Sequence, residues 1–128
     1  MREILLSEQF PKPKFRYSPL VKTGPYYQTA GMIALDIETD QLIAGGVQAE
    51  TSKILSNLTN ALPDFDLCLK DLIIARIYTT EFDKFPLINE AWEQVFTTDI
   101  TPPARSAIGV SQLPLGAKVE IEFSFYRE

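Results

Sequence analysis

The chain has 128 residues, 45% of them hydrophobic, which is enough for one shared core and too short for two domains. We therefore expect a single domain over residues 1–128. There is no histidine, which excludes a Ser-His-Asp or Cys-His catalytic system and a histidine-ligated metal. The net charge is −5 and the 12 basic residues are spread along the chain, so nucleic acid is not an expected partner.

The N-terminal segment shows no targeting pattern. Residues 1–8 include acidic side chains and no apolar run of signal-peptide length, and no run of about 18 apolar residues occurs elsewhere. We therefore expect a cytoplasmic protein without a membrane partner. Residues 8–16 contain two prolines and no clean period, which indicates an extended arm over the surface.

A hairpin and a helix are predicted next. Apolar and aromatic residues flank the turn formers at 22–25, which predicts strands near 17–21 and 26–33. A polar loop over 36–46 ends at Gly45 and Gly46, and there the period changes from two to about 3.6. A single apolar stripe then predicts a helix over 47–62, which Pro63 ends. We interpret the glycine pair as the helix entry.

The second half repeats the alternation of strand and helix. A β-rich run predicts a strand near 72–79, and helical spacing predicts a second helix near 83–97 with Trp92 in the core. Strands follow over 104–110 and 118–127, separated by a Pro/Gly turn. The single cysteine, Cys68, cannot form an internal disulfide, and its apolar neighbours indicate a half-buried position.

The order β-β-α-β-α-β-β predicts an α+β domain in which both helices cover one face of a mixed sheet. The opposite face is then uncovered. It would expose part of Tyr17, Tyr26 or Tyr27 together with apolar strand residues, which favours self-association.

Two stretches carry a family resemblance: residues 45–51 (Gly-Gly-Val-Gln-Ala-Glu-Thr), and residues 102–106 (Pro-Pro-Ala-Arg-Ser) followed by 118–122 (Lys-Val-Glu-Ile-Glu). With Tyr17, Gly31 and the Asn-Glu-Ala-Trp segment at 89–92, they make the chain similar to the reactive-intermediate deaminase (Rid, formerly YjgF-like) family from about residue 15 onward. The resemblance implies a chorismate-mutase-like subunit in a homotrimer, with a central barrel and ligand clefts between subunits. It also implies hydrolysis of 2-imino acids or their enamines to 2-keto acids and ammonia, without metal or cofactor.

The resemblance also assigns roles to individual residues. Arg105 matches the arginine that holds the substrate carboxylate, and Glu120 matches the acid that positions the attacking water. Tyr17 matches an aromatic contact, and Gly31 a glycine whose backbone lines the pocket. Arginine suits this task because its planar fork gives two parallel hydrogen bonds to a carboxylate. A protonated imine is already electrophilic, so one carboxylate can serve without histidine.

The chain departs from the family at three positions expected in the cleft. Ala30 stands where many deaminases have serine, Met32 where many have glutamine, and Ala107 where cysteine or threonine is usual. Each change removes a polar or thiol group, which favours a rival function, a non-catalytic sensor of small carboxylate ligands. A ribonuclease role ranks last, because an acidic chain without histidine or a basic stripe is poorly suited to RNA.

Each proposed site residue also has a structural interpretation. Arg105 would form a surface or interface ion pair with Glu120 or Glu122. Glu120 would be a solvated residue on the polar face of the last strand. Tyr17 would pack at a subunit contact, where tyrosine suits a surface that is part apolar and part wet.

Overall fold

The computed structural model describes residues 1–128 as one six-stranded mixed sheet with two long helices. The elements are β1 (Glu3–Ile4), β2 (Leu20–Thr23), β3 (Tyr26–Thr29), α1 (Gly46–Ala61), β4 (Leu72–Thr79), α2 (Phe85–Val95), β5 (Ala104–Gly109) and β6 (Val119–Tyr126). The sheet order is β1-β2-β3-β6-β4-β5; β4 and β5 are parallel and the other pairs are antiparallel. The predicted element order is confirmed, with β1 as an unpredicted addition.

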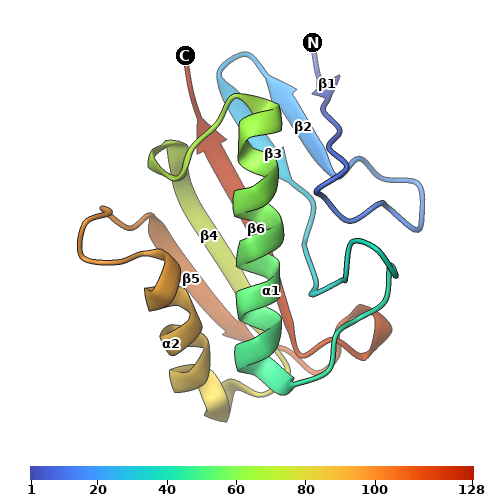
Figure 1. Ribbon diagram of the computed structural model, residues 1–128, viewed down its shortest axis with the longest axis vertical. Coiled ribbons are helices and arrows are strands. Elements are labelled where there is room, and N and C mark those ends of the chain that lie inside the picture. The colour runs from blue at the N-terminus through green and yellow to red at the C-terminus, as the bar shows by residue number, and fades with distance from the viewer.

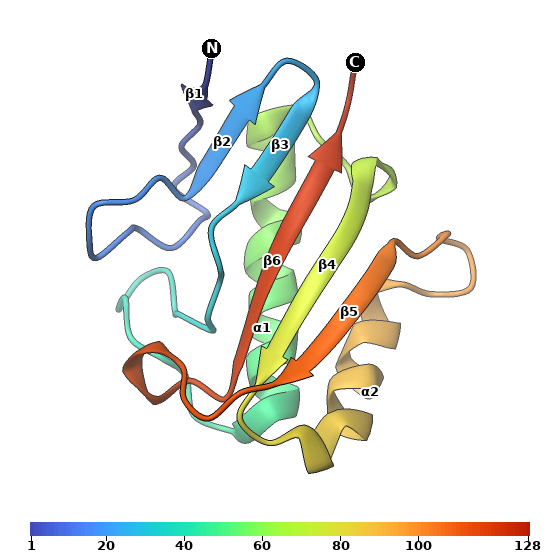
Figure 2. The same cartoon turned by 180° about the vertical axis from the view of Figure 1, so that it is seen from behind.

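Both helices lie on one face of the sheet, as predicted (Figure 1), and Figure 2 shows the uncovered face from behind. Alternation along β6 explains this layering, because every second residue points to the helices. Those residues are fully buried against the α1 stripe; they are Val119, Ile121, Phe123 and Phe125 on the strand and Ile54, Leu55 and Leu58 on the helix. Neither helix combines the length and apolarity that a membrane crossing needs.

The entry to α1 requires glycine at the position just before the helix. Gly45 has φ of 124°, in the region that side chains rarely adopt, and a Cβ there would lie 2.7 Å from the Cβ of Ala49. The predicted helix-entry role is therefore confirmed. At the other end, α1 stops at Ala61 and a short helical turn, Leu62–Phe65, follows with Pro63 near its start, as the sequence indicates.

Several boundaries differ from the sequence prediction. The first hairpin strand begins at Leu20 rather than at residue 17, and β3 ends at Thr29. The chain then returns to the sheet through a bridge between Met32 and Ile121. α2 begins at Phe85 because residues 82–84 form a separate helical turn. The arm at residues 8–16 is irregular as expected, but Phe10 is buried and packs edge-on against Phe65.

One burial prediction is wrong, and the expected exposure of Tyr17, Tyr26 or Tyr27 is confirmed for the first two. Cys68 is exposed, because Leu67 occupies the buried position and Cys68 lies at the start of the helical turn Leu69–Asp71. Tyr27 is buried, since it points to the helix side of β3. Tyr26, one residue earlier, points to the uncovered face and is about half exposed, as predicted.

The uncovered face is more polar than expected. Gln28, Arg76, Tyr78, Glu120, Glu122 and Ser124 lie there, because they alternate with buried residues on β3, β4 and β6. Cross-strand hydrogen bonds join several of them: the Tyr78 hydroxyl donates to Glu122 at 2.6 Å, and Arg76 donates to Ser124 at 3.3 Å. Ile4, Tyr26 and Ile108 add exposed apolar area at its margins.

A buried carboxylate fixes α1 to the start of β6. Glu50 is 3% exposed, and its Oε1 accepts hydrogen bonds from the backbone N–H groups of Lys118 and Val119 at 2.8 and 3.2 Å. We expect Glu50→Ala to lower the free energy of unfolding by about 2 kcal/mol, because two buried donors lose their acceptor. Urea unfolding at fixed protein concentration measures this. Glu90→Ala, at an exposed helix position, is the control, and an equal loss in both would contradict the prediction.

Candidate functional site

Arg105 lies on the helix-covered side of β5, at the edge of the sheet. It is in register with Ala75, whose side chain is buried beneath the helices. The guanidinium carbon lies 5.2 Å from the ring centroid of Phe85 and 5.0 Å from that of Trp92. Both rings come from α2, two helical turns apart. The flat guanidinium is therefore held on an aromatic platform.

The platform leaves the charge of Arg105 free. No carboxylate of the same chain lies within ion-pair distance, so Arg105 forms no ion pair with Glu120 or Glu122 within one copy, and a pairing across an interface stays a prediction. Burial against the rings lowers the pKa of Arg105 and the Glu93 carboxylate opposes this, but the guanidinium stays charged at neutral pH. A depression beside it is lined by Asn89 and Glu93 of α2 and by Pro102 and Pro103, so Arg105 and the Glu93 carboxylate share its wall without forming an ion pair. The arrangement can receive an anion.

Glu120 lies on the opposite side of the sheet, on β6, beside Gly31. A Cβ at Gly31 would overlap the Glu120 carboxylate and lie 2.7 Å from its Cδ. The approach is fixed by the bridge one residue later, where the Met32 N–H donates to the Ile121 carbonyl at 2.8 Å and the Ile121 N–H donates back at 2.9 Å. Gly31 therefore leaves room for the Glu120 carboxylate in its present position, and its φ is not in the left-handed region.

Tyr17 and Ala30 join Gly31 in lining a depression on this side. Tyr17 is 48% exposed and Ala30 is half-buried. The structure thus groups Tyr17, Ala30 and Gly31 around one depression, and Glu120 lies next to Gly31.

Glu120 and Glu122 share a face but differ in their surroundings. Glu122 accepts the Tyr78 hydroxyl, whereas the Glu120 carboxylate has no hydrogen-bond donor within the chain. Partial burial and then the charge of Glu122 raise the pKa of Glu120. A carboxylate with a raised pKa and free lone pairs can accept a proton from water.

The remaining candidates are Ala107 and Met32. Ala107 is half-buried two residues after Arg105, so both lie on the same side of β5. Met32 is 6% exposed and belongs to the core. The bridge to Ile121 turns its side chain inward, where it lines a small depression of about 40 Å³ together with Tyr17, Ala30 and Gly31, so its place in the cleft stays a prediction.

A single copy cannot bring Arg105 and Glu120 to one ligand. Arg105 is in register with Ala75 on β4, and Ala75 is in register with Phe123 on β6. Glu120 lies three residues before Phe123, so the Cα atoms of Arg105 and Glu120 are about 14 Å apart across two strand spacings. Their side chains also leave opposite faces of the sheet. The chain therefore presents two half-sites: the arginine side, Arg105 and Ala107, and the carboxylate side, Tyr17, Ala30, Gly31 and Glu120.

The aromatic platform is the part of the site that the sequence analysis missed. It assigned Trp92 to the core, where the residue does lie at 6% exposure, but gave it no link to Arg105. The available signal was the separation of seven residues between Phe85 and Trp92, which places both on one helical face. No group of three or more metal-ligating side chains is present.

Comparisons with known proteins identify the family. A sequence model described as Endoribonuclease L-PSP matches residues 7–125. A RutC family protein of Pyrococcus horikoshii is 32% identical, and the match covers 100% of both chains. The chain therefore belongs to the Endoribonuclease L-PSP family, which includes the YjgF, RutC and Rid proteins, and the resemblance drawn from the sequence is confirmed.

Two further relatives carry more specific names. A Dermatophagoides farinae protein named 2-iminobutanoate/2-iminopropanoate deaminase is 28% identical, covering 94% of this chain and 93% of its own. The structure of E. coli TdcF with bound serine has a TM-score of 0.90 at 28% identity and covers 98% of this chain and 99% of its own. The α+β fold is thus shared with known members of the family.

Proposed function

We propose that this protein hydrolyses 2-imino acids, of the 2-iminobutanoate and 2-iminopropanoate type, and their enamines to 2-keto acids and ammonia. The observation that carries the proposal is the Arg105 guanidinium, held on two aromatic rings and free of any carboxylate partner. It suits the carboxylate that every 2-imino acid bears. The name of the Dermatophagoides relative and the serine bound to TdcF support the same substrate class.

The proposed mechanism uses the two half-sites in sequence. Arg105 binds the substrate carboxylate and orients the imine carbon. The Glu120 carboxylate takes a proton from water as the water oxygen bonds to the carbon of the protonated imine, and the nitrogen becomes an amine. Glu120 then returns that proton to nitrogen and accepts the hydroxyl proton as ammonia leaves with the C–N electron pair, so the carbinol oxygen becomes the keto oxygen. The route uses no metal and no cofactor.

In this proposal the reacting cleft forms between copies. The arginine side of one copy and the carboxylate side of the next are different surfaces, so their contact is head-to-tail, and we propose that it closes into a ring. The family resemblance implies a homotrimer in which the uncovered sheet faces line a central barrel. We expect light scattering to report three times the chain mass of 14.4 kDa at micromolar concentration. A monomer would contradict a shared cleft.

A direct assay tests the activity. The wild-type protein should release ammonia and keto acid from 2-iminopropanoate and 2-iminobutanoate generated in the assay by an amino-acid oxidase. The alternative, a non-catalytic binding protein, is favoured by the methyl groups of Ala30 and Ala107, which supply no hydrogen bond to a ligand. Keto-acid binding without turnover would establish that alternative and refute the deaminase.

The acid limb of the pH profile should depend on Glu122. Only ionised Glu120 accepts a proton, and the Glu122 charge raises its pKa, so activity falls sooner as the pH is lowered. Glu122→Gln removes the charge and retains an acceptor for Tyr78. We therefore expect its kcat/KM profile to move to lower pH. Glu90→Gln is the control, and coinciding profiles for wild type and Glu122→Gln would refute Glu120 as the base.

A further inference from the structure

An apolar depression adjoins the carboxylate side of the proposed site. It has a volume of about 520 Å³ and shares Tyr17, Ala30 and Gly31 with that side. The arm, the segment after β3 and the loop before β6 surround it, and they lie together at the left in Figure 2. The rest of its lining is mainly apolar: Phe15, Ile33, Leu35, Pro114 and Leu115. We call this depression the side pocket.

The side pocket offers no free charge. Lys14 is its only charged residue, and its ammonium binds the Asp40 carboxylate at 2.8 Å and the Asp40 carbonyl at 3.1 Å. A charged ligand group placed here would lose water without gaining a partner. A hydrocarbon group would instead gain from leaving water.

Two large apolar side chains stand exposed at its margin. Phe15 is 83% exposed and Leu115 is 58% exposed, so neither is buried by its own chain. Leu115 also has φ of 58° and ψ of 21°, a left-handed conformation that favours glycine or asparagine. Packing within the chain therefore explains neither residue, whereas contact with a ligand would.

We infer that the side pocket receives the side chain of the substrate, and that the preferred 2-imino acids carry a branched or aromatic hydrocarbon group. The inference rests on the proposed function, because it takes the reacting carbon to lie beside Glu120. Gly31 connects the position beside Glu120 with the side pocket, because it contacts the Glu120 carboxylate and also lines the pocket. A group on the carbon beside Glu120 thus passes over Gly31, where no Cβ obstructs it. A volume of about 520 Å³ exceeds what a methyl group needs.

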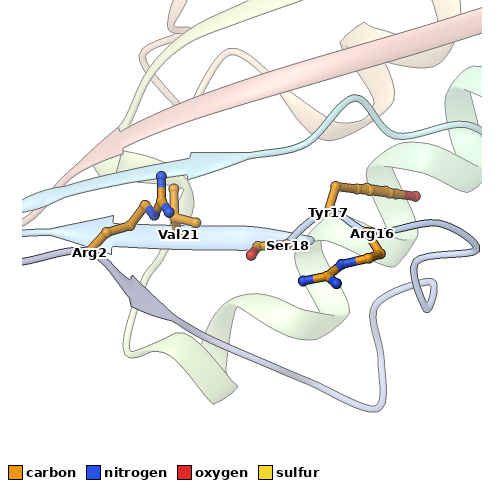
Figure 3. A pocket seen from close by; sticks show the side chains of 5 residues that line it. All are labelled: Arg2, Arg16, Tyr17, Ser18 and Val21. Atoms are coloured by element: carbon orange, nitrogen blue, oxygen red, sulfur yellow. The ribbon is translucent and has the colours of Figure 1, made fainter.

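A second depression, on another side of Tyr17, favours a different ligand, a 2-imino acid with an acidic side chain. It is lined by Arg2, Arg16, Ser18 and Val21 together with Tyr17. Figure 3 shows the two guanidinium groups at opposite ends, with Ser18 and Val21 between them, so they do not converge on one carboxylate. The side pocket is therefore the better-formed receptor, and the acidic ligand becomes a competing outcome of the test.

Calorimetry with stable keto acids tests the inference on the full chain without relying on turnover. The ligands are pyruvate, 4-methyl-2-oxopentanoate and 2-oxoglutarate. Wild type should bind 4-methyl-2-oxopentanoate about tenfold more tightly than pyruvate, because three more carbons leave water. Leu115→Lys should remove most of that preference. Leu6→Lys is the matched control, since Leu6 is also an exposed leucine, at 71%, and lies outside the side pocket.

Each other outcome overturns the inference. Equal binding of pyruvate, or equal effects of the two lysine substitutions, would show that the side pocket is not used. Tightest binding of 2-oxoglutarate, lost in Arg16→Ala, would assign the acidic ligand instead, and no binding of any keto acid would also refute the side pocket. Failure of the proposed function gives a different result, because tight, selective binding without imine hydrolysis refutes only the deaminase.

Discussion

Arg105→Ala lowers kcat/KM for 2-iminopropanoate by about a thousandfold in our account, since removing one partner of a desolvated charge pair raises the barrier by several kcal/mol. Alanine cannot bind the carboxylate, so the imine carbon is no longer held in place. Arg105→Lys should retain a trace of activity, because lysine supplies a point charge without the planar fork. Steady-state ammonia release measures all three proteins.

Folding of Arg105→Ala is the necessary control. The variant loses the contacts with Phe85 and Trp92, which are worth about 1 kcal/mol, so its Tm should fall by only a few degrees. Assembly should be unchanged. Wild-type activity in this variant would refute the deaminase assignment by way of this cleft. Loss of assembly would make Arg105 chiefly an interface residue.

Gly31→Ala should lower activity by about a hundredfold while the protein still folds, because small displacements of a catalytic group have effects of this size. The added Cβ overlaps the Glu120 carboxylate, which is the movable end of a flexible side chain. Glu120 can therefore swing away at little energetic expense, but it then no longer meets the attacking water. Assays of kcat with thermal melts separate the two effects.

Gly109→Ala provides the matched comparison. Its Cβ would meet only Phe82 at 3.4 Å, an ordinary contact, and neither glycine has a left-handed φ. Activity close to wild type is expected for this variant. If Gly31→Ala is equally active, the contact between Gly31 and Glu120 has no part in the reaction.

The sequence predicted those elements whose patterns are local. α1 has a glycine entry, one apolar stripe and Pro63 at its end, and β6 alternates so regularly that its buried and open faces can be read directly. β1 was missed because two residues carry no period, and their pairing with β2 depends on tertiary contacts. Cys68 was misplaced for a similar reason, since Leu67 satisfies the apolar pattern alone.

The composition of the candidate site was accessible from the sequence, but its geometry was not. The motif at 102–106 indicated Arg105, yet β5 does not alternate in polarity, so nothing in it specifies which face the arginine takes. That face is set by the two rings of α2. The division into an arginine side and a carboxylate side follows from strand register, which a single sequence does not encode locally.

Complementation between two inactive variants tests the central claim, that the site is shared between copies. Arg105→Ala and Glu120→Gln are each nearly inactive alone, and they are mixed, unfolded and refolded together. In random ring assemblies from equal amounts, about a quarter of the clefts combine an intact Arg105 with an intact Glu120 from the neighbouring copy, so about a quarter of wild-type activity should return. Mass spectrometry confirms that the copies have exchanged. Exchanged assemblies that remain inactive would contradict the account.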